Sequence, residues 1–158
     1  MKTPEATLAA RYAADGYVVV ESLFAGTECD TLKEEAQRVL REHGRRNLTV
    51  YVGAAVQSAA FRSLADDPRV INLLRPLMPD GVMFLSDKIV FKSGEKTFAS
   101  PWHIDAFYWA GTRPKLSVWI PLDDVSAANG TLKVVRGSHR RGCLPGIQDD
   151  TQIGRAHV

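Results

Sequence analysis

Apolar and polar residues alternate with helical spacing at the start of the chain and with strand-like texture soon after. Residues 4–14 are expected to form a helix, with Pro4 in its first turn and Gly16 just past its end. The segment DGYVVVESL, residues 15–23, is rich in β-branched residues and predicts a short β-rich run. The chain is therefore expected to begin as a helix followed by a strand.

A second helix is expected to begin near Thr27 and to run to about His43 or Gly44. Thr27 and Asp30 resemble a capping box, with Asp in place of the usual Glu or Gln. Apolar residues follow at i, i+4, i+7 and i+8, namely Leu32, Ala36, Val39 and Leu40. This spacing places them on one face, which should be buried.

A third helix is expected after Asp67, which is suited to the N-cap, with Pro68 at the first helical position. Its apolar face is formed by Val70, Ile71 and Leu74. Pro79 and Gly81 should stop it.

From Val82 onward the residue composition changes from one typical of helices to one typical of strands. Four stretches rich in Val, Ile, Phe, Trp and Thr predict antiparallel strands over 83–92, 102–108, 115–122 and 131–135. Turn residues separate them, and Asn129 with Gly130 predicts a tight turn. The sequence thus predicts one α+β domain in which the helices pack on a sheet.

Composition is ordinary for a globular protein and narrows the possible partners. The chain has 158 residues, 45% of them hydrophobic and 24% charged, and its net charge is +2. No basic stripe indicates nucleic acid and no basic amphipathic helix indicates a membrane surface. Two cysteines, Cys29 and Cys143, are too few for a disulfide framework, and the N-terminus lacks the apolar run of a signal peptide. A reduced, cytoplasmic location is expected.

The candidate chemistry lies in the stretch SPWHIDAFYW. On a strand, side chains alternate between faces, so His103 and Asp105 should point to one face and Ile104 to the other. An imidazole and a carboxylate are two of the three ligands in the 2-His-1-carboxylate site of non-haem iron oxygenases. A histidine and an aspartate two positions apart also occur often by chance, so the neighbouring motifs decide.

Those motifs resemble one family. PWHIDAFYW, then WIPLDD, then NGTL and RGSH, in that order over about residues 15–145, are similar to the phytanoyl-CoA dioxygenase family of Fe(II)- and 2-oxoglutarate-dependent oxygenases. Arg136 stands where that family usually has proline. The position shapes a turn rather than the metal site.

The resemblance implies a fold, cofactors and site residues. The fold would be a double-stranded β-helix, a cupin-like jelly-roll barrel, here truncated, with the N-terminal helices packed on it. His103 and Asp105 match the first two Fe(II) ligands, leaving coordination positions for 2-oxoglutarate and O2. Trp119 and a position on or near Lys88 match residues that contact 2-oxoglutarate.

Each residue also has a structural interpretation. Any one of the aromatic residues around the motif could simply pack in the core, although Tyr108 is the best substrate-side candidate because it follows Asp105 by three positions. Lys88 could be a solvated lysine on a strand. Asp123 and Asp124 resemble a pair of acids, but they follow a strand and precede a loop, so we interpret them as turn and capping residues.

The third ligand is missing from the expected pattern. His139 lies in a GSH turn, where the family has a structural histidine, whereas the distal iron ligand and the arginine that pairs with 2-oxoglutarate come several strands later. The ending IGRAHV is the peptide that a common short-read sequencing adapter encodes in one frame, so His157 is not assigned as a ligand. We therefore expect an incomplete dioxygenase domain over 1–152, with helices to about residue 80, and a non-native tail over 153–158.

Two functions follow from the sequence. The first is the N-terminal part of a dioxygenase that hydroxylates a small or acyl-type molecule while converting 2-oxoglutarate to succinate, with this fragment inactive by itself. The alternative is a non-catalytic jelly-roll module that binds a small molecule without a complete metal site. The motifs leave open the substrate and the oligomeric state.

Overall fold

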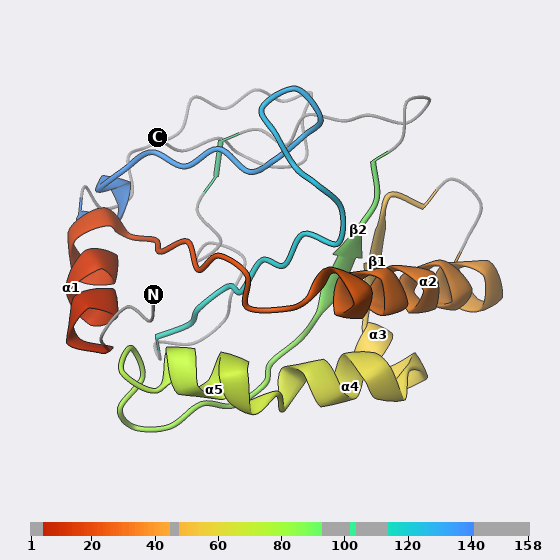
Figure 1. Ribbon diagram of the computed structural model, residues 1–158, viewed down its shortest axis with the longest axis horizontal. Coiled ribbons are helices and arrows are strands. Elements are labelled where there is room, and N and C mark those ends of the chain that lie inside the picture. Colours follow the sequence, from red (N-terminus) through yellow and green to blue (C-terminus); the bar gives the residue numbers. More distant parts are fainter. Residues whose placement is uncertain (1–4, 45–47, 93–101, 104–113, 141–158) are drawn as a thin grey trace. The chain divides into compact units, whose positions relative to one another are not determined.

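The computed structural model describes residues 5–44, 48–92, 102–103 and 114–140 (Figure 1). The chain divides into two compact units. The first unit contains Met1–Val18, Phe98–Trp119 and Lys133–Val158, and the second contains Val19–Thr97 and Ile120–Leu132. Asp105, Tyr108 and most of the expected strand over 102–108 lie outside the described residues.

The first unit is built on helix α1 (Glu5–Asp15) and the short 3-10 helix η2 (Ser138–Arg140). Leu8 is buried. The amide of Gly16 donates to the carbonyl of Tyr12 at 2.8 Å, and Gly16 has a φ of +83°, which suits a glycine just past a helix. The predicted first helix is confirmed over its described part.

The β-rich run expected over 15–23 is wrong. Residues 17–20 are not part of a strand, and the next residues form a turn in which Ser22 has a φ of +55°. β-Branched residues favour a strand only when a neighbouring strand supplies the ladder hydrogen bonds, and these residues pair with no strand in the described part of the chain.

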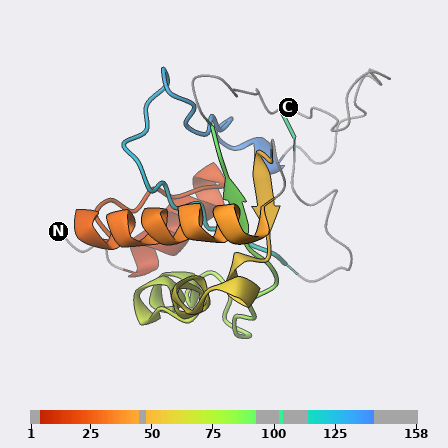
Figure 2. The same cartoon turned by 90° about the vertical axis from the view of Figure 1, so that its right-hand side faces the viewer.

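Helices dominate the second unit. They are α2 (Gly26–His43), α3 (Ala54–Gln57), α4 (Ala59–Ala65) and α5 (Pro68–Leu74). α2 contacts α3 and α4, and it lies above the row formed by α3, α4 and α5 in both views (Figures 1 and 2). The core of the second unit consists of Leu32, Ala36 and Val39 of α2, Ala54 and Ala55 of α3, and Val70 of α5. The predicted apolar face of α2 is thus confirmed at Leu32, Ala36 and Val39.

The start of α2 differs from the prediction. The N-cap is Ala25, and the carboxylate of Glu28 accepts a hydrogen bond from its amide at 2.8 Å, while Thr27 lies inside the helix. Glu28 occupies the N3 position, where its side chain can reach back to the N-cap. The N-cap therefore lies at Ala25, two residues before the predicted position at Thr27. The end at His43, with Gly44 as the C-cap, is confirmed.

α5 begins as predicted. The carboxylate of Asp67 accepts from the amide of Arg69 at 2.8 Å, and Pro68 is at the first helical position. The helix ends at Leu74, before Pro79 is reached. α3 and α4 were not predicted from the sequence: α3 has only four residues, and α4, although as long as α5, lacks the Asp-Pro start that marks α5.

The sheet of the described chain has two strands, β1 (Val50–Val52) and β2 (Lys88–Val90), paired antiparallel with Val50 opposite Val90 and Val52 opposite Lys88. β2 falls within the strand expected over 83–92. Residues 115–122 and 131–135 are described but are not strands, and a jelly-roll barrel is not shown. The residue pattern marked them as β-prone, but a strand requires a partner, and β2 pairs instead with β1, which was not predicted.

The turn expected at Asn129 and Gly130 is confirmed. Gly130 has a φ of +98°. The side chain of Asn129 closes the loop: its amide donates to the carbonyl of Asp124 at 2.7 Å and its oxygen accepts from the amide of Ser126 at 2.6 Å. A short polar side chain thus supplies the loop with hydrogen bonds that a ladder would otherwise give.

Candidate functional site

His103 is the one predicted metal ligand that the structure describes. It lies in the first unit with Trp102, and the side chains of both residues are exposed. Asp105 and Tyr108 lie outside the described residues, so the predicted convergence of His103 and Asp105 stays a prediction. An exposed imidazole is compatible with metal ligation, which requires a ring nitrogen at a surface or cavity.

Trp119 also belongs to the first unit. Its side chain is 44% exposed, and that of Trp102 is 46% exposed. Neither tryptophan is therefore buried in the core of the described chain. Half-exposed indole rings combine a large apolar face with an N–H donor, a combination common at ligand contacts.

Lys88, the other candidate for 2-oxoglutarate, opens β2 in the second unit. It is exposed and shares one face of the two-stranded ribbon with Val52 and Val90, since residues paired across or two apart on a strand point the same way. Val52 and Val90 are exposed to 58% and 50%. Lys88 thus provides the positive charge on an otherwise apolar exposed ribbon face.

Asp123 and Asp124 hold a loop together rather than forming an acid pair. The carboxylate of Asp123 makes an ion pair with Lys33 of α2, and this contact raises the pKa of the lysine. The carbonyl of Asp124 accepts the hydrogen bond from Asn129. These contacts agree with their interpretation as turn residues.

The imidazole of His139 contacts the backbone of α1. Its Nε2 lies 3.1 Å from the carbonyl oxygen of Ala13 in α1. In the described part of the chain, no three His, Cys, Asp or Glu side chains gather into a metal site, His139 included. The donor chemistry predicted for iron therefore rests on His103 and on Asp105, a nitrogen and an oxygen ligand that suit Fe(II).

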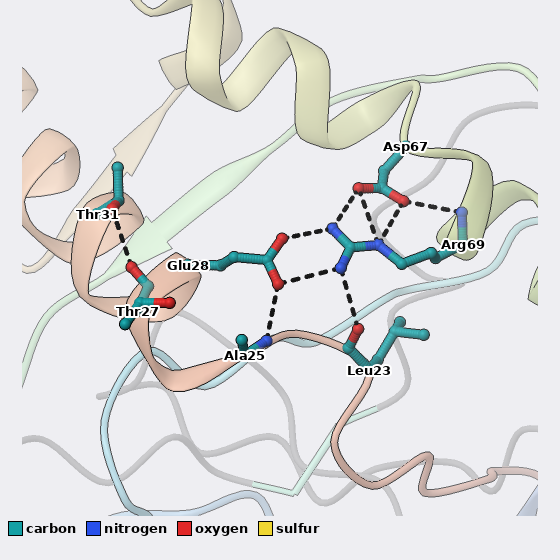
Figure 3. A network of polar contacts seen from close by, with 7 residues as sticks. All are labelled: Leu23, Ala25, Thr27, Glu28, Thr31, Asp67 and Arg69. Carbon is teal, nitrogen blue, oxygen red and sulfur yellow. Dashed lines mark hydrogen bonds and ion pairs between the residues drawn. The ribbon is translucent and has the colours of Figure 1, made fainter.

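Figure 3 shows a network of hydrogen bonds and ion pairs around Arg69. This network was not predicted from the sequence. The guanidinium donates to both oxygens of Glu28, at 2.7 and 3.1 Å, to Asp67 at 2.8 Å, and to the carbonyl of Leu23 at 3.3 Å. It also lies 4.5 Å from the ring centroid of Phe24. The hydrogen bonds from Arg69 lower the pKa of Glu28 and of Asp67. The network joins the beginnings of α2 and α5 and occupies both carboxylates, which makes it structural.

A second network contains a serine hydrogen-bonded to a carboxylate. The hydroxyl of buried Ser58 donates to Glu35 at 2.6 Å, and the guanidinium of Arg38 donates to the same carboxylate at 2.7 and 2.8 Å. The hydrogen bonds from Arg38 and then Ser58 lower the pKa of Glu35 to about 2. A carboxylate held in this way by a guanidinium is a weak base, which argues for a structural role of Ser58 rather than a nucleophilic one. The i, i+3 spacing of Glu35 and Arg38 was the available sequence signal.

One structural finding bears on the predicted localisation. Within the described residues, no helix is both long and apolar enough to cross a membrane.

Comparison with known proteins bears on the whole chain. A sequence model of the family described as phytanoyl-CoA dioxygenase (PhyH) matches residues 12–152. Ectoine dioxygenase of Sphingopyxis alaskensis is 29% identical over an alignment covering 94% of this chain and 56% of that protein. L-proline trans-4-hydroxylase of Streptomyces griseoviridis is 24% identical, covering 92% and 58%. The peroxisomal phytanoyl-CoA dioxygenase of Bos taurus is 22% identical, covering 93% and 56%.

The chain spans about half the length of the curated relatives it matches. No solved structure matches it significantly.

Proposed function

We propose that the chain, which belongs to the phytanoyl-CoA dioxygenase family, forms part of an Fe(II)- and 2-oxoglutarate-dependent dioxygenase. The proposed enzyme hydroxylates a small molecule. The observation that carries the proposal is the family match over residues 12–152, which contains His103, Asp105, Trp119 and the RGSH motif. Dioxygenases of this family generally use Fe(II) and 2-oxoglutarate.

His103 and Asp105 would hold the iron, through an imidazole nitrogen and a carboxylate oxygen. When bound, the metal and 2-oxoglutarate supply the oxidising chemistry, in which the cosubstrate is decarboxylated to succinate and O2 is consumed. The chain's own residues bind and orient the reactants. The exposure of His103 and the half-exposed indole of Trp119 support these roles.

Lys88 would pair with a carboxylate of 2-oxoglutarate. Its exposed position on the β1–β2 ribbon supports this role, because the ammonium is accessible to an anionic cosubstrate. Tyr108 is proposed for the substrate side of the site. Neither Lys88 nor Tyr108 is a proposed iron ligand, so each role can be tested by substituting that residue alone.

Small polar molecules are favoured over acyl thioesters as substrates. The relatives named for ectoine and proline reach 29% and 24% identity to this chain, against 22% for the relative named for phytanoyl-CoA. Ectoine and proline are small compounds, whereas an acyl-CoA is a large thioester that carries a nucleotide. A small hydroxylation substrate is therefore the sharper proposal.

The test uses the full-length parent enzyme. His103→Ala and Asp105→Ala should each abolish substrate-dependent succinate formation and weaken Fe(II) binding measured by equilibrium dialysis. His43→Ala, at the exposed end of α2, is the matched control and should retain both. Unchanged succinate formation in both site variants would show that the iron site lies elsewhere.

The 158-residue chain alone should form no substrate-dependent succinate. Two protein ligands without a distal histidine and without the arginine that pairs with 2-oxoglutarate would hold Fe(II) weakly. Robust turnover by this chain would contradict the assignment, and absence of turnover in the full-length parent with any small substrate would favour the non-catalytic binding module.

A further inference from the structure

We propose that residues 136–140 form a latch that caps the C-terminal turn of α1, with His139 as its positioning residue, so that α1 opens as a unit when the latch is broken. The latch is the segment RGSHR, defined by Arg136, Gly137, Ser138, His139 and Arg140. It lies in the same compact unit as α1, although more than a hundred residues separate them along the chain. The proposal does not depend on the iron chemistry.

The first step concerns the carbonyl groups that end α1. A helix leaves its last four carbonyls without partners inside the helix, and they need donors from elsewhere. The residue that follows the helix supplies one such donor: the amide of Gly16 donates to the carbonyl of Tyr12. The latch supplies the others that are seen: Arg140 donates to Ala13 at 2.8 Å, and the amide of Gly137 donates to Asp15 at 2.8 Å.

The second step concerns the proton on His139. Its Nε2 lies 3.1 Å from the carbonyl oxygen of Ala13. A carbonyl oxygen only accepts, so this hydrogen bond requires the proton to be on Nε2. His139 and Arg140 thus donate together to one carbonyl, which has two lone pairs and can serve both.

The third step concerns space. The Nδ1 side of the ring rests on Gly16, where an added Cβ would lie only 2.5 Å from Nδ1. No side chain fits there while the imidazole keeps its place. A glycine at position 16 is therefore required twice, by its φ of +83° and by the ring.

The fourth step concerns charge. Arg136 donates through Nε to the carboxylate of Asp15 at 2.7 Å, and Arg140 reaches the helix end, so two guanidinium groups lie at the negative end of the α1 dipole. The latch contacts are polar, α1 buries Leu8 among its described side chains, and the second unit has its own buried core. Because α1 and the latch belong to one compact unit, we expect loss of the latch to raise the opening of α1 and not that of the second unit's core.

Limited trypsin digestion of the 158-residue chain, followed by mass spectrometry, tests the latch. Cleavage after Arg11, which lies in α1 and is exposed, reports the opening of that helix. Cleavage after Lys33, in α2, reports the second unit. His139→Ala should speed cleavage after Arg11 about two- to tenfold, the range of one hydrogen bond, and leave cleavage after Lys33 unchanged.

Two conservative variants separate positioning from general packing. A glutamine amide nitrogen can occupy the place of Nε2, so His139→Gln should restore the wild-type rate after Arg11, whereas His139→Asn reaches only the place of Nδ1 and should behave as His139→Ala. Nitrogen-15 spectra of the imidazole should show the proton on Nε2. An unchanged rate in His139→Ala, equal rescue by both amides, or a parallel rise at Lys33 would each overturn the proposal.

Discussion

Replacing Gly16 with alanine separates two physical costs that the structure assigns to one residue. Gly16 has a φ of +83°, and holding an alanine there costs about 1–2 kcal/mol. Its new Cβ would also lie 2.5 Å from Nδ1 and 3.0 Å from Cγ of His139, so the exposed ring must move away and lose its hydrogen bond, at a cost of about 0.5–1.5 kcal/mol. We expect the free energy of opening α1 to fall by about 1.5–3.5 kcal/mol.

Gly81 is the matched control. Its φ is +107°, but nothing lies within 4 Å of the place where a Cβ would be added. Gly81→Ala should therefore show the backbone cost alone, about 1–2 kcal/mol. The difference between the two substitutions isolates the clash with the imidazole.

Native-state hydrogen exchange measures both, through the amides of α1 for Gly16→Ala and those flanking residue 81 for Gly81→Ala. The double variant Gly16→Ala with His139→Ala should lose less than the sum of the single variants, because the clash disappears with the ring. Equal losses at the two glycines, or strict additivity in the double variant, would refute the reasoning.

Three further predictions concern the second unit. Since Arg38 lowers the pKa of Glu35 to about 2, ionised Glu35 stabilises the fold above its ordinary pKa of 4.5, and this stabilisation is lost as the pH falls from 4.5 to 2; Glu35→Gln should flatten a urea-midpoint profile over that range, and an unchanged slope would contradict it. Arg69→Lys should lower the urea midpoint nearly as much as Arg69→Ala, because an ammonium cannot reproduce the forked contacts, whereas full rescue by lysine would show that charge alone matters. Val39→Ala, at a site that is 0% exposed, should cost about 2–4 kcal/mol in urea unfolding, against no more than about 0.5 for Val56→Ala at a site 73% exposed; similar costs would place the core elsewhere.

Local signals predicted α1, α2, α5 and the turn at Asn129 and Gly130, but not α3 and α4. Asp67 and Pro68 start α5 because a side-chain acceptor and a missing amide suit a helix N-terminus whatever the surroundings. Asn129 and Gly130 form a turn for the same reason, since one closes the loop with its own side chain and the other accepts a positive φ. The family was likewise evident from the order of motifs along the chain, and the match over residues 12–152 confirmed it.

Contacts between distant residues decided the rest. The predicted N-cap of α2 was wrong; Glu28, which caps the helix from its N3 position, is also held by Arg69 of α5, a contact that no local pattern shows. The iron assignment on His103 and Asp105 remains a prediction from spacing and resemblance.

The sequence by itself determined the start of α5, the apolar face of α2 and the family, because short-range hydrogen bonds and residue order depend only on neighbours along the chain. Only the tertiary structure decided which β-prone segments became strands, since β2 forms where β1 supplies a ladder of hydrogen bonds. It also decided the role of His139, whose place on Gly16 and Ala13 depends on a contact across more than a hundred residues that no local pattern encodes.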